Sequence, residues 1–311
     1  MDGKIGLFVN NVEGYQGCIV REAREAAQRE GLEVQVLDAQ HIVAKQAQDM
    51  ARFENESRGK RSCILVVPEG DAILEGDIAG DPTFHLARRM LQKGVGWITL
   101  NHGREELVGS LRTMFPYLPI ALVAIDNVEF GRTQARQLKA LLPRGGTVLC
   151  VLGNPLDTAS QDRSAGMMQE LQGSGITVEE VDGHWTESVA ETTVHKWITS
   201  PVRRQTALDA VVCQADQMGA AARTVLVRVA DVLGRPELKH VPVIGGDGLP
   251  SIGRPWVDDG RLTATVCVTL PGEPAVAQLA RYWREGTPLA PVTRLPVSSY
   301  PPLDALRPAG R

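Results

Sequence analysis

The stretch VPVIGGDGLPSIGRPWVDDGRLTATVCV, residues 241–268, decides how the rest of the chain is interpreted. An apolar run ends at Gly245, and the turn after it carries Asp247 between two glycines. A short helix and a second strand, residues 261–268, are predicted to follow. Open α/β sheets place ligand-binding groups at the carboxyl ends of their strands, and glycine permits positive φ angles and close approach of the backbone to a ligand. Asp247 is therefore either a ligand-binding residue or the cap of the helix that follows it.

Composition and charge narrow the class of protein. The chain has 311 residues, of which 43% are hydrophobic and 23% charged, which suits a globular protein with two separate cores. A net charge of −4 without a basic tract argues against a nucleic-acid partner. No apolar run reaches the roughly 18 residues of a membrane span. The five cysteines are widely spaced, so we expect buried free thiols, and neither a metal nor a cofactor.

The amino terminus bears on the compartment. MDGKIGLFVNN leads almost directly into a predicted strand, without the charged, apolar and small-residue regions of a signal peptide. We expect the chain as written to be cytoplasmic. It would be periplasmic, or belong to the cell envelope, if a signal has been trimmed or is unannotated.

Strand-like and helical segments alternate along the chain, and the alternation starts again near residue 120. Strands are predicted at residues 5–9, 34–37, 63–67, 96–100, 120–125, 148–152, 178–181, 208–213, 241–245 and 261–268. Helices are predicted at residues 14–30, 42–58, 81–93, 104–117, 128–142, 159–172, 187–199, 216–233 and 274–285. The proline-rich tail can add a strand at residues 292–295 but no long helix. Two runs of alternation predict an α/β fold with two doubly wound parallel-sheet lobes.

Three segments together resemble a known family. They are AIDNVEFGRTQARQL at 124–138, LGNPLDTASQDRSAGMMQEL at 152–171, and VPVIGGDGLPSIGRPWVDDGRLTATV at 241–266. In order and spacing, they resemble the type I periplasmic binding protein superfamily, which includes the sugar-binding proteins of ABC importers and the effector domains of LacI-type repressors. IGLFVNN and WITLNHG fit the pattern too, so the resemblance covers nearly the whole chain.

The resemblance implies an architecture and a function. Two lobes would be joined by three crossing strands, with a ligand cleft between them. The first lobe would comprise residues 1–124 and 270–292, and the second 125–269 and 293–311. The function implied is non-catalytic binding of a small carbohydrate-like ligand with hinge closure, for ABC-type uptake or for sensing. The implied partners are this ligand and an ABC permease or a signalling protein.

The resemblance also carries site residues over. Planar charged groups can hydrogen-bond two sugar hydroxyls at once, and aromatic rings cover the C–H face of a sugar. Asp247 matches the cleft aspartate of the family, and Arg163 matches the arginine on the first helix of the second lobe. Trp185 falls where a stacking aromatic often follows the next strand. Alternatively, Arg163 forms a solvated ion pair with Asp162, and Trp185 only covers the core.

Further site residues are implied at other strand ends. Asn101 and His102 stand where many sugar binders have an Asp-Arg pair, although His102 is also typical of a loop histidine. Tyr15 has a competing role in packing, because it shares a helix face with Ile19. The remaining candidates occupy the first loop, the end of the third strand and the first crossing: Asn10, Asn11, Gln16, Glu69, Asp71, Asp126 and Asn127.

Three positions depart from the pattern of typical sugar binders. Ala215 stands where many have an asparagine, Val268 where several have a glutamine, and His102 where an arginine is common. Each change removes or weakens a polar contact. We therefore expect a ligand less polar than an ordinary pentose or hexose, such as a deoxy sugar, a glycoside with an apolar group, or a non-sugar metabolite.

Two other functions are open to a chain of this kind. An enzyme on a doubly wound fold is disfavoured, since the sequence has no G-x-G-x-x-G after its first strand, no G-x-x-x-x-G-K-[ST] and no G-x-S-x-G. Its six histidines show no metal-ligand spacing. The second alternative is a cytoplasmic effector-sensing regulator that lacks its DNA-binding part and acts as a dimer.

Overall fold

The computed structural model describes residues 3–68, 81–203 and 206–308. The chain divides into two compact units, Met1–Ile125 with Thr269–Leu295, and Asp126–Val268 with Pro296–Arg311. The boundaries expected from the sequence lie at 124/125, 269/270 and 292/293. Glu69 and Asp71, which were implied near the ligand, lie outside the described residues.

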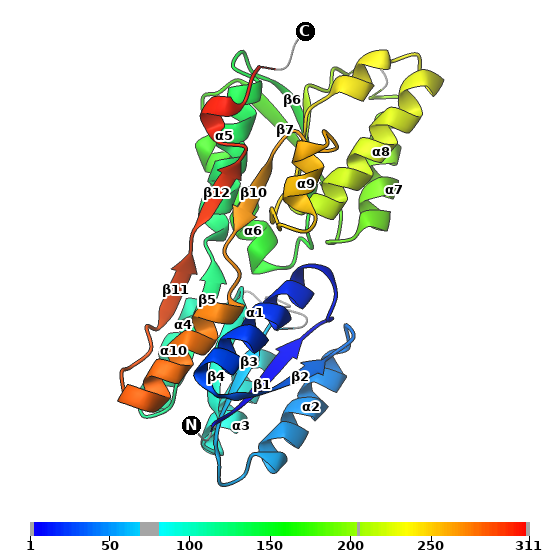
Figure 1. Ribbon diagram of the computed structural model, residues 1–311. Coiled ribbons are helices and arrows are strands. Elements are labelled where there is room, and N and C mark those ends of the chain that lie inside the picture. The colour runs from blue at the N-terminus through cyan, green and yellow to red at the C-terminus, as the bar shows by residue number, and fades with distance from the viewer. Residues whose placement is uncertain (1–2, 69–80, 204–205, 309–311) are drawn as a thin grey trace. The chain divides into compact units, whose positions relative to one another are not determined.

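The first unit is built on a six-stranded sheet with strand order β11-β5-β4-β3-β1-β2 (Figure 1). Every pair in this sheet is parallel. Parallel strands covered on both faces are apolar throughout, and all six residues of β5 are indeed buried. The strands are β1 (Gly3–Val9), β2 (Glu33–Asp38), β3 (Arg61–Val66), β4 (Gly96–Asn101), β5 (Ile120–Ile125) and β11 (Val292–Leu295).

Helices cover both faces of this sheet. On one face, Met50, Phe84 and Leu111 of three helices pack with Trp97 and Leu122 of the sheet in a single apolar cluster. On the other, α1 and α10 pack against each other, as Figure 1 shows. The helices are α1 (Gly14–Glu30), α2 (Val43–Glu56), α3 (Pro82–Gln92), α4 (Glu105–Met114) and α10 (Gly272–Glu285).

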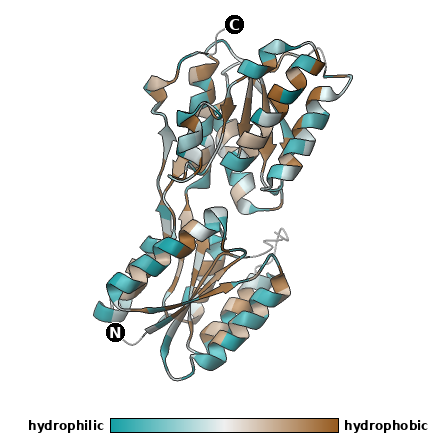
Figure 2. Ribbon diagram, turned by 45° about the vertical axis from the view of Figure 1, so that its right-hand side comes forward, coloured by the Kyte–Doolittle hydropathy of each residue, from teal (hydrophilic) through white to brown (hydrophobic). Residues whose placement is uncertain are grey.

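The second unit contains a four-stranded parallel sheet with order β7-β6-β8-β9. Side chains along β6 alternate between two cores: Leu149 and Val151 pack under α7 and α8, whereas Val148 and Cys150 pack under α5 and α6. The elements are α5 (Asn127–Leu141), β6 (Gly146–Leu152), α6 (Thr158–Glu170), β7 (Ile176–Asp182), α7 (Glu187–Thr199), β8 (Ala210–Cys213), α8 (Asp216–Val232), β9 (Val243–Ile244) and α9 (Gly253–Asp258). In both units the sheets are hydrophobic and the helices present hydrophilic surfaces (Figure 2). The predicted α/β class with parallel sheets is confirmed.

One strand pair differs from the parallel arrangement that the sequence predicted. Strand β10 (Thr265–Val268) pairs antiparallel with β12 (Val297–Tyr300), an element missing from the predicted set. The preceding strand, β11, instead pairs with β5 in the first unit. Pro296 lies between β11 and β12. Because proline has no backbone N–H, it separates the pairing of β11 with β5 from the pairing of β12 with β10. The chain therefore changes unit at Pro296 and not at residue 293.

Two glycines bring α5 and α6 into backbone contact. A Cβ atom on Gly131 of α5 would lie 1.9 Å from the carbonyl oxygen of Arg163 on α6. One on Gly166 of α6 would lie 2.0 Å from the carbonyl oxygen of Val128 on α5. Because neither position tolerates a side chain, the two helices pack as closely as their backbones permit, and residues on α6 are placed directly against the start of α5.

We expect Gly131→Ala to lower the free energy of unfolding by about 1–3 kcal/mol, since the added methyl group must push the two helices apart. Gly109→Ala is the matched control, because Gly109 lies within α4 and a Cβ atom there meets no atom within 4 Å. The control should gain up to about 1 kcal/mol from its better helix propensity. Urea unfolding followed by circular dichroism measures both. An unchanged stability of Gly131→Ala would contradict the contact.

Candidate functional site

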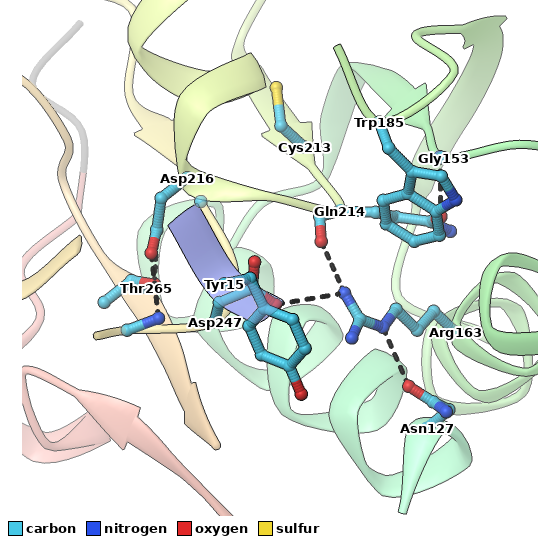
Figure 3. Close-up of polar contacts among 12 residues, drawn as sticks. Tyr15, Asn127, Gly153, Arg163, Trp185, Cys213, Gln214, Asp216, Asp247 and Thr265 are labelled. Carbon is cyan, nitrogen blue, oxygen red and sulfur yellow. Dashed lines mark hydrogen bonds and ion pairs between the residues drawn. The ribbon is translucent and has the colours of Figure 1, made fainter. Parts of the chain in front are cut away.

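The guanidinium of Arg163 lies at the centre of a buried polar cluster in the second unit (Figure 3). The residue is only 4% exposed. Its Nε donates to Oδ1 of Asn127 at 2.9 Å, and its Nη1 donates to the carbonyl oxygen of Gln214 at 2.5 Å. The ring of Phe130 lies beneath it, with the guanidinium carbon 3.7 Å from the ring centroid. Two elements therefore hold this one side chain: α5, through Asn127 and Phe130, and the turn after β8, through Gln214.

Asp247 forms an ion pair with Arg163. Its Oδ1 lies 3.6 Å from Nη1 of Arg163. The backbone at Asp247 has φ of 95°, a conformation that few non-glycine residues adopt. Burial raises the pKa of its carboxyl group to about 6, against the opposing effect of the Arg163 charge. The side chain is therefore ionised at neutral pH, beside a cation and largely shielded from water.

The structure excludes the structural roles that the sequence offered as alternatives for Asp247 and Arg163. Asp247 is not the cap of α9, because the N-cap position of that helix is Ile252 and it has no side-chain cap. Arg163 forms its ion pair with Asp247, 84 positions along the chain, and is not the exposed partner of a neighbouring carboxylate. Both residues point into the same cluster.

Trp185 contacts both the buried charges and the apolar core. Its indole N–H donates to Oδ2 of Asp157 at 2.5 Å, and its ring lies 5.3 Å from the guanidinium carbon of Arg163. The ring also packs on the core beneath α7 and α8. A Cβ atom on Gly153 would lie 2.1 Å from the ring, so that glycine is needed for the ring to lie flat on the turn after β6. An aromatic face thus borders the buried charges.

Sequence reasoning missed Gln214, which joins the turns of this unit. Its Oε1 accepts the Gly153 N–H and the Ser160 hydroxyl, each at 2.8 Å. Its Nε2 donates to the carbonyl oxygen of Ser160 and to Oγ of Ser164. A polar residue directly after a buried strand was a usable signal, but the comparison with sugar binders drew attention to Ala215 instead.

Asp216 was missed as well. It is fully buried at the start of α8, where Oδ1 accepts the Thr265 hydroxyl at 2.6 Å and Oδ2 accepts the Gly248 N–H at 2.8 Å. Burial, and next the charge of Asp247, raise the pKa of Asp216 to about 8. At neutral pH this second carboxyl group is therefore mostly protonated and neutral.

Asp126 and Asn127 occupy the start of α5 with separate roles. Asp126 caps the helix by accepting the Glu129 N–H at 2.9 Å. Asn127 is buried and orients Arg163. Of this pair, Asn127 belongs to the cluster, whereas the side chain of Asp126 is engaged by its own helix.

The candidates in the first unit lie at the carboxyl ends of β1 and β4. The Tyr15 hydroxyl donates to Oδ1 of Asn101 at 2.7 Å, and Asn101 has a positive φ of 73°. Oε1 of Gln16 accepts the backbone N–H of Asn10 at 2.7 Å, which gives it a structural role in the loop. Nδ2 of Asn11 lies 3.1 Å from Nε2 of His41. His102, the residue after Asn101, is half-buried.

The family model of the periplasmic binding protein domain matches residues 7–284. The chain belongs to this family. None of the curated proteins compared matches it. Within the described residues, no helix combines the length and apolar character needed to cross a membrane, and no group of three or more His, Cys, Asp or Glu side chains is arranged to hold a metal ion.

Several solved structures share the fold of this periplasmic binding protein domain. A solute-binding protein of an ABC transporter from Actinobacillus succinogenes, with D-allose bound, is 17% identical with a TM-score of 0.76, and 96% of each chain is covered. The myo-inositol-binding protein of Caulobacter is 22% identical with a TM-score of 0.74, covering 96% of this chain and 92% of that one. A fructose-binding periplasmic domain of a hybrid two-component system is 20% identical with a TM-score of 0.75, covering 95% and 89%.

Two apolar residues of the second unit, Ala215 and Val268, were expected from the sequence to make the ligand site less polar. Ala215 is buried and occupies the N-cap position of α8 without a side-chain cap. Val268 is half-buried, and its backbone N–H donates to the carbonyl oxygen of Asp247 at 3.1 Å. The polar character of the cluster therefore rests on Arg163 and Asp247 and not on these neighbours.

The raised pKa of Asp247 makes stability depend on pH. The Asp247 carboxyl group binds its proton more tightly in the folded state than in the unfolded state. Its contribution to the free energy of unfolding is therefore complete below about pH 4 and is lost as pH rises through about 6. We expect the stability of Asp247→Asn relative to the wild type to increase by roughly 2–3 kcal/mol between pH 4 and pH 8, because the asparagine has no proton to lose. Guanidinium unfolding across this range measures the difference.

Asp209→Asn is the control for this experiment. Asp209 precedes β8 and accepts the Thr147 N–H at 2.8 Å, away from Arg163. Its substitution removes a carboxylate at the opposite end of β8 from the Arg163 contacts and should not reproduce the effect of Asp247→Asn. If the free energy of unfolding changes with pH in the same way in Asp247→Asn and in the wild type, the pKa of Asp247 is not raised by folding.

Proposed function

We propose that this chain is a non-catalytic binding protein for a small, polyhydroxylated ligand with an apolar portion, and that Arg163, Asp247 and Trp185 bind it. One observation carries the proposal. A guanidinium, a carboxylate and an indole ring are gathered in a single buried cluster at the carboxyl ends of parallel strands. This combination suits vicinal hydroxyls on one side of a ligand and C–H groups on the other.

The similar solved structures support the ligand class. Their titles name D-allose, myo-inositol and fructose as the molecules bound. They share the fold at low identity, so they support a polyol or sugar in general and no particular one. In this chain Ala215 and Val268 replace polar side chains, which supports a ligand with fewer hydroxyl groups than a hexose.

The partner protein depends on whether the bound ligand is transported or sensed. Delivery to an ABC permease and sensing through a signalling protein are both consistent with the family, since one similar structure belongs to an ABC transporter and another to a two-component system. We propose that the role of the protein is uptake or sensing. Its compartment and its partner protein depend on which of these two roles it has.

Ligand-induced stabilisation tests the site. The full chain should show a higher melting temperature in the presence of a matching compound from a panel of myo-inositol, D-allose, L-arabinose, fructose, their deoxy derivatives and their alkyl glycosides. Asp247→Ala should abolish this shift, because a charged hydrogen-bond acceptor is lost, and affinity should fall at least about tenfold. Asp209→Asn should retain the full shift. An unchanged shift in Asp247→Ala would refute the assigned site.

Calorimetric titration tests the less polar character of the ligand. We expect a deoxy sugar or an alkyl glycoside to bind at least about tenfold more tightly than its fully hydroxylated parent, since no side chain at 215 or 268 satisfies the additional hydroxyls. The double variant Ala215→Asn/Val268→Gln should narrow or reverse that preference. Tight binding of an unmodified hexose by the wild type would contradict the expectation.

A further inference from the structure

Asp216 makes hydrogen bonds to the residues on both sides of Asp247. Its backbone N–H donates to the carbonyl oxygen of Gly246 at 2.7 Å, and its Oδ2 accepts the Gly248 N–H at 2.8 Å. The turn that carries Asp247 is thus held at the residue before it and at the residue after it. Both bonds come from Asp216 on α8, 31 positions earlier in the chain than Asp247.

The second carboxylate oxygen of Asp216 connects this turn to β10. Oδ1 accepts the Thr265 hydroxyl at 2.6 Å (Figure 3). Cys267, on the same strand, forms a β-bridge with Asp247. Asp216 therefore links the start of α8, the Asp247 turn and β10 through one side chain. A hydrophobic residue of similar size would satisfy none of these groups.

Glycines surround the carboxyl group of Asp216 and leave it no space to turn. A Cβ atom on Gly253 would lie 2.0 Å from Oδ2, and one on Gly245 would lie 2.3 Å from Oδ1. The stretch between these glycines contains Asp247 itself. The spacing of the glycines is thus matched to the carboxyl group that they enclose.

We propose that Asp216 is a positioning residue for Asp247, which fixes the turn in the orientation that presents the Asp247 carboxylate to a ligand. The importance of that orientation for binding rests on the proposed function. The positive φ of Asp247 explains why a fixed turn is required, because this backbone conformation is unfavourable for aspartate unless surrounding bonds hold it.

Asp247 is the charged group that acts on Asp216. Two arginines lie on its neighbours: Arg163 of α6 pairs with Asp247, and Nε of Arg254 of α9 contacts the Gly248 carbonyl oxygen and the Cys267 sulfur. Cys213 and Cys267 are the neighbouring thiols. Burial and the charge of Asp247 both favour the protonated form of Asp216, so the two carboxyl groups do not carry full charge together at neutral pH.

The two carboxyl groups should therefore influence each other's titration. We expect the ¹³C carboxyl signal of Asp247, in the ligand-free full chain labelled at aspartate, to show a main step and a smaller step at higher pH as Asp216 ionises. Asp216→Asn should keep the main step and lose the smaller one. Its amide can still accept the Gly248 N–H and donate to the Thr265 hydroxyl, so the turn is preserved.

Asp216→Ala removes both bonds and should loosen the turn. We expect it to shift the main step of Asp247 by more than about half a pH unit and to speed amide exchange at Gly248 at least about tenfold. Asp216→Asn should retain the slow exchange. The control Asp209→Asn, at the opposite end of β8, should reproduce the wild type in both measurements. Asp247→Asn identifies the signal by its disappearance.

Identical Asp247 titrations and identical Gly248 exchange in the wild type, Asp216→Asn and Asp216→Ala would overturn the proposal. A role for Asp216 in general packing alone would lower the melting temperature of the alanine variant without altering the Asp247 titration, and that result would also overturn it. Because no ligand is present, the outcome is independent of whether the ligand panel yields a binder.

Discussion

The burial of the Arg163 charge is the constraint on which the second unit depends. A guanidinium removed from water costs several kcal/mol unless its hydrogen bonds and its charge are matched. The partners that match it come from separate elements: Asn127 from the start of α5, the Gln214 carbonyl from the end of β8, and Asp247 from the turn after β9. The backbone contact between α5 and α6 keeps Arg163 within reach of all of them. The contacts that stabilise the second unit are therefore the same ones that the proposed ligand site would use.

The glycines near Asp247 illustrate how this arrangement is preorganised. From the sequence, they were interpreted as positions where the backbone could approach a ligand. The structure shows protein atoms in that space: Asp216 oxygens lie against Gly245 and Gly253, and the Phe130 ring lies against Gly246. A turn fixed in this way loses little conformational freedom when a ligand binds, which favours affinity. In the proposed site, a ligand would meet a carboxylate whose direction is already set.

Most of the fold could be predicted because its strands are buried on both faces. Such strands are continuous apolar runs, and β5 was predicted with the bounds observed, as were helices α1 and α7. Strand β12 could not be predicted in the same way. Its sequence, VSSY, is short, polar and preceded by a proline, and it becomes a strand only by pairing with β10, about thirty residues earlier in the chain. Strand pairing across that separation leaves no local pattern.

The sequence by itself determined the α/β class, the strand ends at which polar residues gather, and, through three spaced segments, the family. Only the tertiary structure decided which polar groups are partners. Arg163 pairs with Asp247, Gln16 is bound to the loop beside it, and Gln214 and Asp216 prove central. The physical reason is that periodicity records burial within one element, whereas the hydrogen bonds of a buried charge join elements far apart, as with the 51 positions between Arg163 and Gln214.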